Sequence, residues 1–430
     1  MRMVWLLLYN VIAVPLMWLL FYLLAIRNPK IRKGIEGRKA LFKKLAAELQ
    51  KHSAKSPCFW IHNSSMGEFE QARPLIYELK RKFPNCLVLV TFFSPSGLEH
   101  VQTGHGADIL CYMPFDSFFK ARRFVRLVRP VAAIVIRHEF WSNHLCRLNR
   151  EGVPLILANA SIRRASLFRY PLILSVQRFF YRSFDVILSV SQETMDILSQ
   201  YQLHKGHAEM TGDTRYDQVV QRARDAEITI VPLLKLKGKH DCLVAGSTWP
   251  SDEAVLFPAL SKLKSKDLLP WIVLVPHEPT ETHLFQAETE LHQFGLSTCR
   301  YSELGSTTSA CDVLLVDRVG LLASLYALGD IAFVGGGFGP GVHQVLEPAA
   351  LGLSVFYGPK NKNSYEAELI KKRGVGFVVE HPNQLYNQLF SFLKNPERME
   401  TLGNKASMLV KENVGASKRI VTCLEKIMVP

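Results

Sequence analysis

One carboxylate of this sequence stands where a small polar turn leads from a strand into a helix. Residues 61–68 read Ile-His-Asn-Ser-Ser-Met-Gly-Glu, so Glu68 opens the amphipathic segment that follows the turn. Open α/β sheets bind their ligands at this edge, and a carboxylate there can take the proton of an incoming hydroxyl. We therefore expect Glu68 to act as a general base, with Ser65 and Gly67 positioning the acceptor. The alternative is that Glu68 only stabilises the positive end of its helix.

A second acid occupies an equivalent place. Arg137-His-Glu-Phe-Trp141 follows the strand predicted at 131–136, so we expect Glu139 at the same sheet edge, where it would position an acceptor or a sugar. The alternative is that Glu139 caps the next helix.

A glycine-rich turn follows the strand predicted at 331–334. Residues 335–341 read Gly-Gly-Gly-Phe-Gly-Pro-Gly, and glycine lets the backbone approach a ligand closely and aim several N–H groups at it. We expect Gly335, Gly336 and Gly337 to bind a phosphate. The alternative is a connector that needs glycine only for tight packing.

The residues after this turn add to the predicted anion site. A helix is expected from about Val342, and the positive end of a helix favours an anion. His343 would assist a phosphate or a carboxylate, and Glu347 would accept hydrogen bonds from a ribose.

Two further turns follow strands of the same predicted sheet. Ala245-Gly-Ser-Thr248 offers the hydroxyls of Ser247 and Thr248, and Gly358-Pro-Lys-Asn-Lys-Asn363 offers Lys360 and Asn363. Each turn alone could be an ordinary helix cap. Together, at one edge of one sheet, they favour donor binding.

The sequence lacks the motifs of several classes of enzyme. The first strand is not followed by G-x-G-x-x-G and no Walker A motif is present, which argues against a dinucleotide-dependent dehydrogenase and an NTPase. The 14 histidines include no H-E-x-x-H, and no Asp-x-Asp pair suggests a bridging metal. We expect a reaction without a metal or another cofactor.

Two α/β domains are needed to position these residues. The chain has 430 residues, 48% hydrophobic and 21% charged, which is typical of folded domains. Short apolar runs without strict alternation predict parallel strands covered on both faces. The predicted strands are 58–63, 86–92, 131–136, 153–159, 185–190, 241–246, 271–275, 312–316, 331–334 and 353–356, with helices near 68–82, 116–128 and 171–183.

The predicted organisation has five parts. They are a membrane anchor (1–30), a basic juxtamembrane segment (31–56), an acceptor-binding domain (57–211), a polar linker (212–240) and a donor-binding domain (241–430). The last helix is free to return to the first domain. The outline is that of two facing doubly wound domains.

The first 44 residues predict a membrane partner. Residues 4–26 contain no charge and are long enough to span a bilayer, whereas a signal peptide would have a shorter apolar region and a cleavage site. Basic residues follow this segment, which predicts that the body of the protein stays in the cytoplasm. These residues are Arg27, Lys30, Arg32, Lys33, Arg38, Lys39, Lys43 and Lys44.

The net charge agrees with an anionic membrane surface. Lys and Arg number 52 against 38 Asp and Glu, a balance of +14, and the basic, aromatic segments 116–129 and 169–183 could lie on lipid. Alternatively, the apolar residues of these two segments belong to the hydrophobic core of the domain. No nucleic-acid-binding signature is visible. The eight cysteines are scattered, and we expect all of them to be reduced.

These stretches together resemble the 3-deoxy-D-manno-octulosonic acid (Kdo) transferases of lipid A biosynthesis, over nearly the whole chain. The resemblance rests on the N-terminal anchor, His62–Glu68, Glu139-Phe-Trp141, Asn159-Ala-Ser-Ile-Arg163, Gly212–Asp217, Ala245–Thr248, Phe333–Gly336, His343-Gln-Val-Leu-Glu-Pro348 and Gly358-Pro359 with Asn363.

The resemblance implies a GT-B glycosyltransferase of the inner membrane, with the acceptor domain first and the donor domain second. It implies CMP-Kdo as donor, lipid IVA as acceptor, and inversion without a catalytic metal. The family's catalytic carboxylate falls on Glu68, Arg163 is carried over as an acceptor-positioning residue, and His277 and Gln344 as donor-binding residues.

The chain departs from the family pattern at Arg137, His138, Ser142 and Gln344. Two other functions therefore stay open. One is a GT-B transferase that uses a UDP-sugar and another lipid, and the other is an inactive, membrane-tethered nucleotide-binding scaffold.

Overall fold

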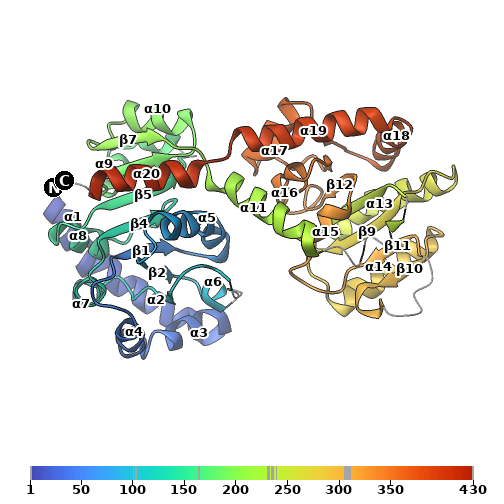
Figure 1. The fold of residues 1–430 in the computed structure, drawn as a ribbon. Helices are drawn as coiled ribbons and strands as arrows, with labels where there is room; N and C mark the ends of the chain where they lie inside the picture. Colours follow the sequence, from blue (N-terminus) through green and yellow to red (C-terminus); the bar gives the residue numbers. More distant parts are fainter. Residues whose placement is uncertain are drawn as a thin grey trace. The chain divides into compact units, whose positions relative to one another are not determined.

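The computed structural model describes residues 2–99, 101, 104–162, 165–229, 233, 237–238, 240–304 and 311–428 (Figure 1). The chain forms two compact units. The first comprises Met1–Gln218 and Gly415–Pro430, and the second comprises Val219–Val414.

The first unit is built on a parallel sheet of seven strands in the order β3-β2-β1-β4-β5-β6-β7. The strands are β1 (Cys58–Asn63), β2 (Leu87–Phe92), β3 (Ile109–Tyr112), β4 (Ala132–Ile136), β5 (Leu155–Ala160), β6 (Val186–Ser189) and β7 (His207–Met210). The strand order reverses between β1 and β4, so the ends of these two neighbours mark the switch point where such sheets bind ligands.

Helices cover both faces of this sheet (Figure 1). Along the chain they are α3 (Pro29–Gly37), α4 (Leu41–Gln50), α5 (Met66–Lys82), α6 (Pro95–Glu99), α7 (Phe118–Val128), α8 (Ser142–Arg150), α9 (Pro171–Tyr181) and α10 (Gln192–Gln200), with the 3-10 turn Ala165–Arg169 before α9. The last helix, α20 (Ala416–Met428), packs on α5. Its Ile420, Val421 and Leu424 join the core on that face of the sheet, beside Phe59 and Ile61.

The N-terminal segment is helical throughout. It comprises α1 (Arg2–Leu8), one π-helical turn (Tyr9–Ala13) and α2 (Val14–Arg27). Within the described part of the chain, Trp5–Arg27 is the one helical stretch that is long and apolar enough to cross a membrane.

The second unit repeats the architecture with the order β10-β11-β9-β8-β12-β13-β14. Its strands are β8 (Cys242–Thr248), β9 (Trp271–Pro276), β10 (Thr298–Arg300), β11 (Val313–Leu315), β12 (Ile331–Val334), β13 (Ser354–Tyr357) and β14 (Gly376–Val378). The order reverses between β8 and β12, so these two strands form the switch point of this sheet.

The helices of the second unit lie on both faces of its sheet. They are α13 (Pro250–Lys264), α14 (Glu281–Gln293), α15 (Leu322–Leu325), α16 (Leu346–Ala350), α17 (Tyr365–Lys372), α18 (Pro382–Leu393) and α19 (Pro396–Glu412), with 3-10 turns at Tyr301–Glu303 and Tyr326–Leu328.

The predicted fold class is confirmed, because each unit is an α/β layer structure around an all-parallel sheet. The stretch 212–240, predicted as a polar linker, contains helix α11 (Thr214–Thr229). The two units divide at 218/219 and again at 414/415, so the last helix belongs to the first unit.

The expectation that all cysteines are reduced is wrong. Cys299 on β10 is joined to Cys311, just before β11, by a disulfide. These two strands are neighbours in the sheet, which brings the two side chains together. The other six cysteines are free and buried, as expected for interior residues.

Candidate functional site

Glu68 is held at the carboxyl end of β1, in the first turn of α5. The backbone N–H and the hydroxyl of Ser64 both donate to its Oε2 atom, each at 2.5 Å. Among the described residues no hydrogen bond reaches Oε1, so this oxygen is available to a substrate. A positioned carboxylate with one unused oxygen is what a general base requires.

Glu139 lies in the loop after β4, the strand beside β1. Burial raises the pKa of its carboxyl group to about 6, and the charge of Glu68 adds to the increase, while hydrogen bonds with Ser64 and Trp141 lower it. The structure therefore brings Glu68 and Glu139 together at the switch point. Two carboxyl groups with different environments at one site are typical of acid–base chemistry.

A buried polar chain fixes the Glu139 loop from behind. Trp141 Nε1 donates to His62 Nε2 at 3.2 Å, and His62 Nδ1 lies 2.8 Å from the hydroxyl of Thr91. Burial lowers the pKa of His62 to about 3, so its ring is neutral. Because Nε2 accepts from Trp141, the ring proton is on Nδ1 and is donated to Thr91.

Ser65 and Gly67 belong to the turn before Glu68. Ser65 precedes the first helical residue of α5 in an extended conformation and makes no capping hydrogen bond with its side chain. A Cβ atom added at Gly67 would meet nothing within 4 Å, so packing does not require glycine there. This open space beside Glu68 leaves room for an acceptor. Arg163 lies outside the described residues.

Two strands of the first unit end in left-handed backbone. Arg137, after β4, has φ 67°, and Asn159, in β5, has φ 55°. Arg137 Nε donates to Gln71 at 2.9 Å, and Asn159 donates to Thr214 Oγ1 at 2.6 Å. Such backbone is costly for residues other than glycine and is concentrated at functional sites. This network was not predicted, because nothing in local sequence shows that α5 and α11 supply its other members.

In the second unit the three predicted turns meet at one edge of the sheet. A Cβ atom at Gly335 would lie 2.2 Å from the carbonyl oxygen of Ser247, and one at Gly337 would lie 2.4 Å from the backbone nitrogen of Gly358. Ser247 itself has φ 55°. Glycine is therefore required because the turns after β8, β12 and β13 pack backbone against backbone.

The glycine turn uses its own N–H groups within the protein. Gly336 and Phe338 donate to the two carboxylate oxygens of buried Asp252, at 2.7 and 3.1 Å. Trp249 N also donates to Asp252, at 3.0 Å. The structure thus does not offer the N–H groups of Gly336 and Phe338 to a phosphate. Asp252 was missed, although an acid three residues into a helix is a typical capping residue.

The expected helix start at Val342 is also wrong, because α16 begins at Leu346 and has five residues. Residues 342–345 are held in an irregular segment by the β13 turn. Val342 N donates to Lys360 O at 3.0 Å, and Asn363 Nδ2 donates to Val342 O at 3.0 Å. Lys360 Nζ donates to Gly339 O at 3.0 Å. Lys360 and Asn363 therefore shape the glycine turn.

His343 and His277 form one stack with Trp249. The two imidazole rings lie 4.3 Å apart, and Trp249 lies 4.8 Å from His277. Burial, with a contribution from His277, lowers the pKa of His343 to about 4. Trp249 Nε1 donates to His343 Nε2 at 3.0 Å, so the neutral ring carries its proton on Nδ1. His343 can therefore donate a hydrogen bond to an anion, but it supplies no positive charge.

The remaining predicted donor residues lie around this stack. Thr248 Oγ1 donates to buried Glu253 at 2.8 Å. Glu347 accepts from Arg222 at 2.5 Å, so its carboxylate already has a cationic partner. Gln344 Oε1 accepts weakly from the N–H of Leu346, at 3.4 Å.

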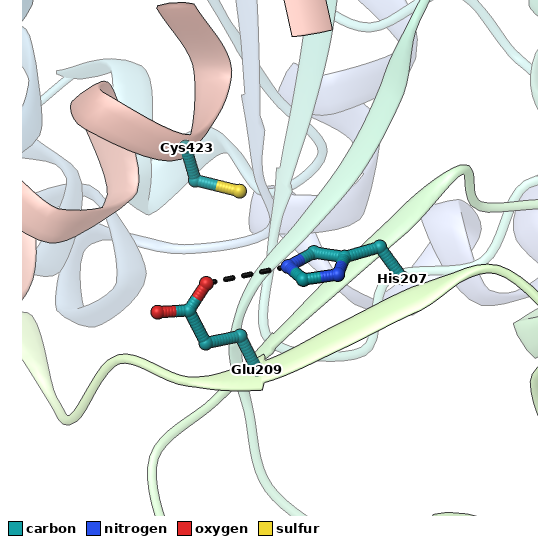
Figure 2. A group of neighbouring side chains, drawn as sticks. All are labelled: His207, Glu209 and Cys423. Atoms are coloured by element: carbon teal, nitrogen blue, oxygen red, sulfur yellow. Dashed lines mark hydrogen bonds and ion pairs between the residues drawn. The ribbon is translucent and has the colours of Figure 1, made fainter. Parts of the chain in front are cut away.

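A different group of side chains could hold a metal ion. Figure 2 shows His207 and Glu209 of β7 facing Cys423 of α20, with their potential ligand atoms within 4.8 Å of one another. His207 Nε2 and Glu209 Oε2 are 3.2 Å apart. Burial and the charge of Glu209 raise the pKa of the Cys423 thiol, which disfavours the thiolate that a metal needs. This group lies on the edge strand, away from Glu68.

The chain is similar to proteins of one enzymatic family. Residues 36–218 match the family model described as 3-deoxy-D-manno-octulosonic-acid transferase (kdotransferase). The 3-deoxy-D-manno-octulosonic acid transferase of Aquifex aeolicus (strain VF5) is 31% identical over 337 residues, which is 78% of this chain and 85% of the relative. The transferase of the same description from Haemophilus influenzae (strain KW20) is 26% identical over 420 residues, 96% of each chain.

Solved structures support the two-domain fold. UDP-GlcNAc 2-epimerase from Neisseria meningitidis, bound to UDP-GlcNAc, matches 86% of this chain and 100% of its own with a TM-score of 0.63 and 14% identity. Anabaena Alr3699/HepE, in complex with UDP and glucose, matches 85% of this chain and 99% of its own with a TM-score of 0.51 and 13% identity. These likenesses bear on the GT-B-like fold alone.

Proposed function

Because this chain belongs to the family of 3-deoxy-D-manno-octulosonic acid transferases, we propose that it transfers Kdo from CMP-Kdo to the lipid A precursor lipid IVA. The reaction takes place at the cytoplasmic face of the inner membrane, inverts the anomeric carbon and needs no metal. The observation that carries this proposal is Glu68, fixed by Ser64 at the switch point beside Glu139.

Glu68 acts as the general base. Its Oε1 atom takes the proton of the acceptor hydroxyl as that oxygen attacks the anomeric carbon of Kdo. The bond between this carbon and the phosphate oxygen of CMP breaks, and CMP leaves with the electron pair. General-base assistance of this kind contributes about 10²–10⁴-fold.

Glu139 positions the acceptor beside the base. With a pKa of about 6 it is mainly ionised at pH 7, so it accepts hydrogen bonds from sugar hydroxyls. We expect Ser65, Gly67 and, from the family resemblance, Arg163 to contribute to acceptor binding.

The donor binds to the second unit, where the turns after β8, β12 and β13 meet. We expect Ser247 and Lys360 to contact the phosphate of CMP and His343 to donate to it from Nδ1. His277, Thr248, Gln344 and Asn363 support this surface. Gly335, Gly336 and Gly337 allow the ligand to approach the backbone closely.

Glu347 is expected to reach a ribose, in keeping with its place on α16 next to this edge of the sheet. Its ion pair with Arg222 would hold the carboxylate in position.

The test is mass spectrometry of lipid IVA after incubation with the detergent-solubilised protein and CMP-Kdo. We expect one or more added Kdo masses with the wild-type protein and none with Glu68→Gln, which should still bind CMP. Glu78→Gln is the matched control, since Glu78 lies on the same helix and pairs with Arg81 on the surface. Turnover by Glu68→Gln would remove Glu68 from the role of base.

The same assay separates the other two functions. Competition by UDP and not by CMP would point to a UDP-sugar donor. Binding of CMP with no transfer to any lipid acceptor would point to an inactive scaffold.

A further inference from the structure

The N-terminal helix is attached to the first unit from Trp5 to Ala25. At its start Trp5 Nε1 donates to Ser175 at 3.2 Å, and in the π-helical turn Tyr9 Oη donates to Asp116 at 2.8 Å. Asn10 donates to Asn143 at 3.0 Å. Polar groups of a helix surrounded by lipid would lack such partners.

Aromatic contacts continue this attachment through α2. Trp18 packs on Phe115 with ring centroids 4.6 Å apart, and Phe21 packs on Phe93 and Phe115. Near the end of the helix, Ala25 is buried and its carbonyl oxygen accepts from Arg32 Nε at 3.1 Å. One face of the helix is therefore occupied by protein from Trp5 to Ala25.

The opposite face carries an apolar stripe. Leu7, Val11, Leu16, Leu19, Leu23 and Ile26 are each more than half exposed, and they recur at helical spacing. Phe119 on α7 is 78% exposed, and Leu172 on α9 is 67% exposed. Exposed apolar area of this extent in a folded protein marks an interaction surface.

Cationic side chains flank the helix along both halves. A groove of about 640 Å³ beside residues 6–14 is lined by Arg147 and Arg150. A second groove, of about 790 Å³ and beside residues 18–26, is lined by Lys120 and Arg123. Lys120 Nζ lies 4.0 Å from the centre of the Trp18 ring.

These positions decide between two orientations in a membrane. If the docked helix crossed the bilayer, α7 and α8 would enter it and their arginines and lysines would reach hydrocarbon, where charged side chains are strongly disfavoured. If the helix lies parallel to the surface, its apolar stripe enters the lipid and Lys120, Arg123 and Arg150 meet the headgroups, while Arg147 is paired with Glu151. Basic flanks and an apolar face are typical of such interfacial helices.

We infer that Arg2–Arg27 is an in-plane membrane helix that stays docked on the first unit and faces an anionic lipid surface, without crossing the bilayer. The inference rests on the membrane association proposed above and goes beyond it by fixing the orientation. Both ends of the helix are then on the cytoplasmic side, and the carboxyl ends of β1 and β4 are held at a fixed height above the lipid.

The first test is the side on which the N-terminus lies. A Gly-Ser-Cys-Gly-Ser extension at the N-terminus of the full-length protein reaches water in either orientation. The six free native cysteines are buried and should not react. A membrane-impermeant maleimide should label the extension in inverted inner-membrane vesicles and not in intact spheroplasts. Lys51→Cys, an exposed position of the body, marks the cytoplasmic side as the matched control. Labelling in spheroplasts, complete or partial, overturns the inference.

The second test measures how deeply each part of the helix enters the bilayer. Leu7→Cys, Leu16→Cys and Ile26→Cys, each carrying an environment-sensitive fluorophore, should be quenched by brominated lipids at the same depth, because an in-plane helix has no gradient along its axis. A crossing helix would place Leu16 near the bilayer centre and the other two near opposite interfaces. That gradient would overturn the in-plane orientation.

Membrane association itself is measured separately, by fractionation of cells at low and high salt. A protein found in the soluble fraction would contradict the association proposed above. A membrane-bound protein labelled from outside would contradict the in-plane orientation alone.

Discussion

Replacing Glu139 by glutamine should make the protein more stable at neutral pH and less active. Burial and the charge of Glu68 raise the pKa of Glu139 from 4.5 to about 6 in the folded protein. Between these two values the folded state binds more protons than the unfolded state, so stability falls as the pH rises through this window. Above about pH 6 the ionised carboxylate of Glu139 lowers the free energy of unfolding by its full amount.

The size of this cost follows from the two pKa values. A difference of about 1.5 pH units corresponds to roughly 2 kcal/mol. Glutamine has nearly the same shape and no charge, so Glu139→Gln should raise the free energy of unfolding by about this amount at pH 7.5 and by almost nothing at pH 4.5. For a unit of this size the melting temperature should rise by about 4–8 °C.

The assay is thermal unfolding of the detergent-solubilised protein at both pH values, beside the transfer assay. Glu78→Gln, on the surface of α5, controls for the loss of a carboxylate as such. In the Glu68→Gln background the gain from Glu139→Gln should shrink, since one cause of the raised pKa is then absent.

An equal effect of Glu139→Gln at both pH values would refute this reasoning. So would a destabilisation at pH 7.5, which would mean that Glu139 is held by favourable contacts with Ser64 and Trp141. Wild-type transfer activity in the variant would remove Glu139 from the acceptor site.

Three further outcomes are expected. Gly67→Ala should leave the melting temperature unchanged and lower transfer by tenfold or more. Gly335→Ala should instead destabilise the second unit, because its Cβ would lie 2.2 Å from Ser247 O. Thermal unfolding and the transfer assay measure both effects, and equal melting temperatures of the two variants would contradict this contrast. His343→Phe should weaken CMP binding about equally at pH 6 and pH 8, because a ring whose pKa is about 4 is neutral at both; a loss confined to pH 6 in calorimetric titrations would contradict this. Tyr9→Phe should cost about 1 kcal/mol through the lost bond to Asp116, and an unchanged melting temperature would speak against the docked helix.

The sequence predicted the long central elements well and the edges poorly. β1, β4, β8 and β12 are runs of apolar residues covered on both faces, so local composition identifies them. The short edge strands β3, β7, β10 and β14 were missed. β7 reads His-Ala-Glu-Met and is largely exposed, so its strand character depends on pairing with β6 and not on its own pattern.

The roles of the site residues stay predictions, but the place of a residue could be predicted where it follows a strand and not where its partner is remote. The positions of Glu68 and Glu139 at the sheet edge were predicted because turns after strands are visible in sequence. Asp252 was not, since its contacts with Gly336 and Phe338 join residues more than 80 positions apart. The sequence predicted a phosphate for the N–H group of Gly336, whereas the anion that it contacts is the internal carboxylate of Asp252, which no ligand pattern reveals.

The N-terminal helix and the loop that carries Glu139 share one support. Asp116 accepts from Tyr9 of the helix and from the backbone N–H groups of Asn143 and His144, which open α8. Asn143 is also the residue that Asn10 contacts. α8 begins at Ser142, directly after the loop that carries Glu139, so the N-terminal helix would release the base of that loop if it moved away. If the acceptor is a lipid, as proposed, this arrangement ties the height of Glu68 and Glu139 to the surface from which the acceptor comes.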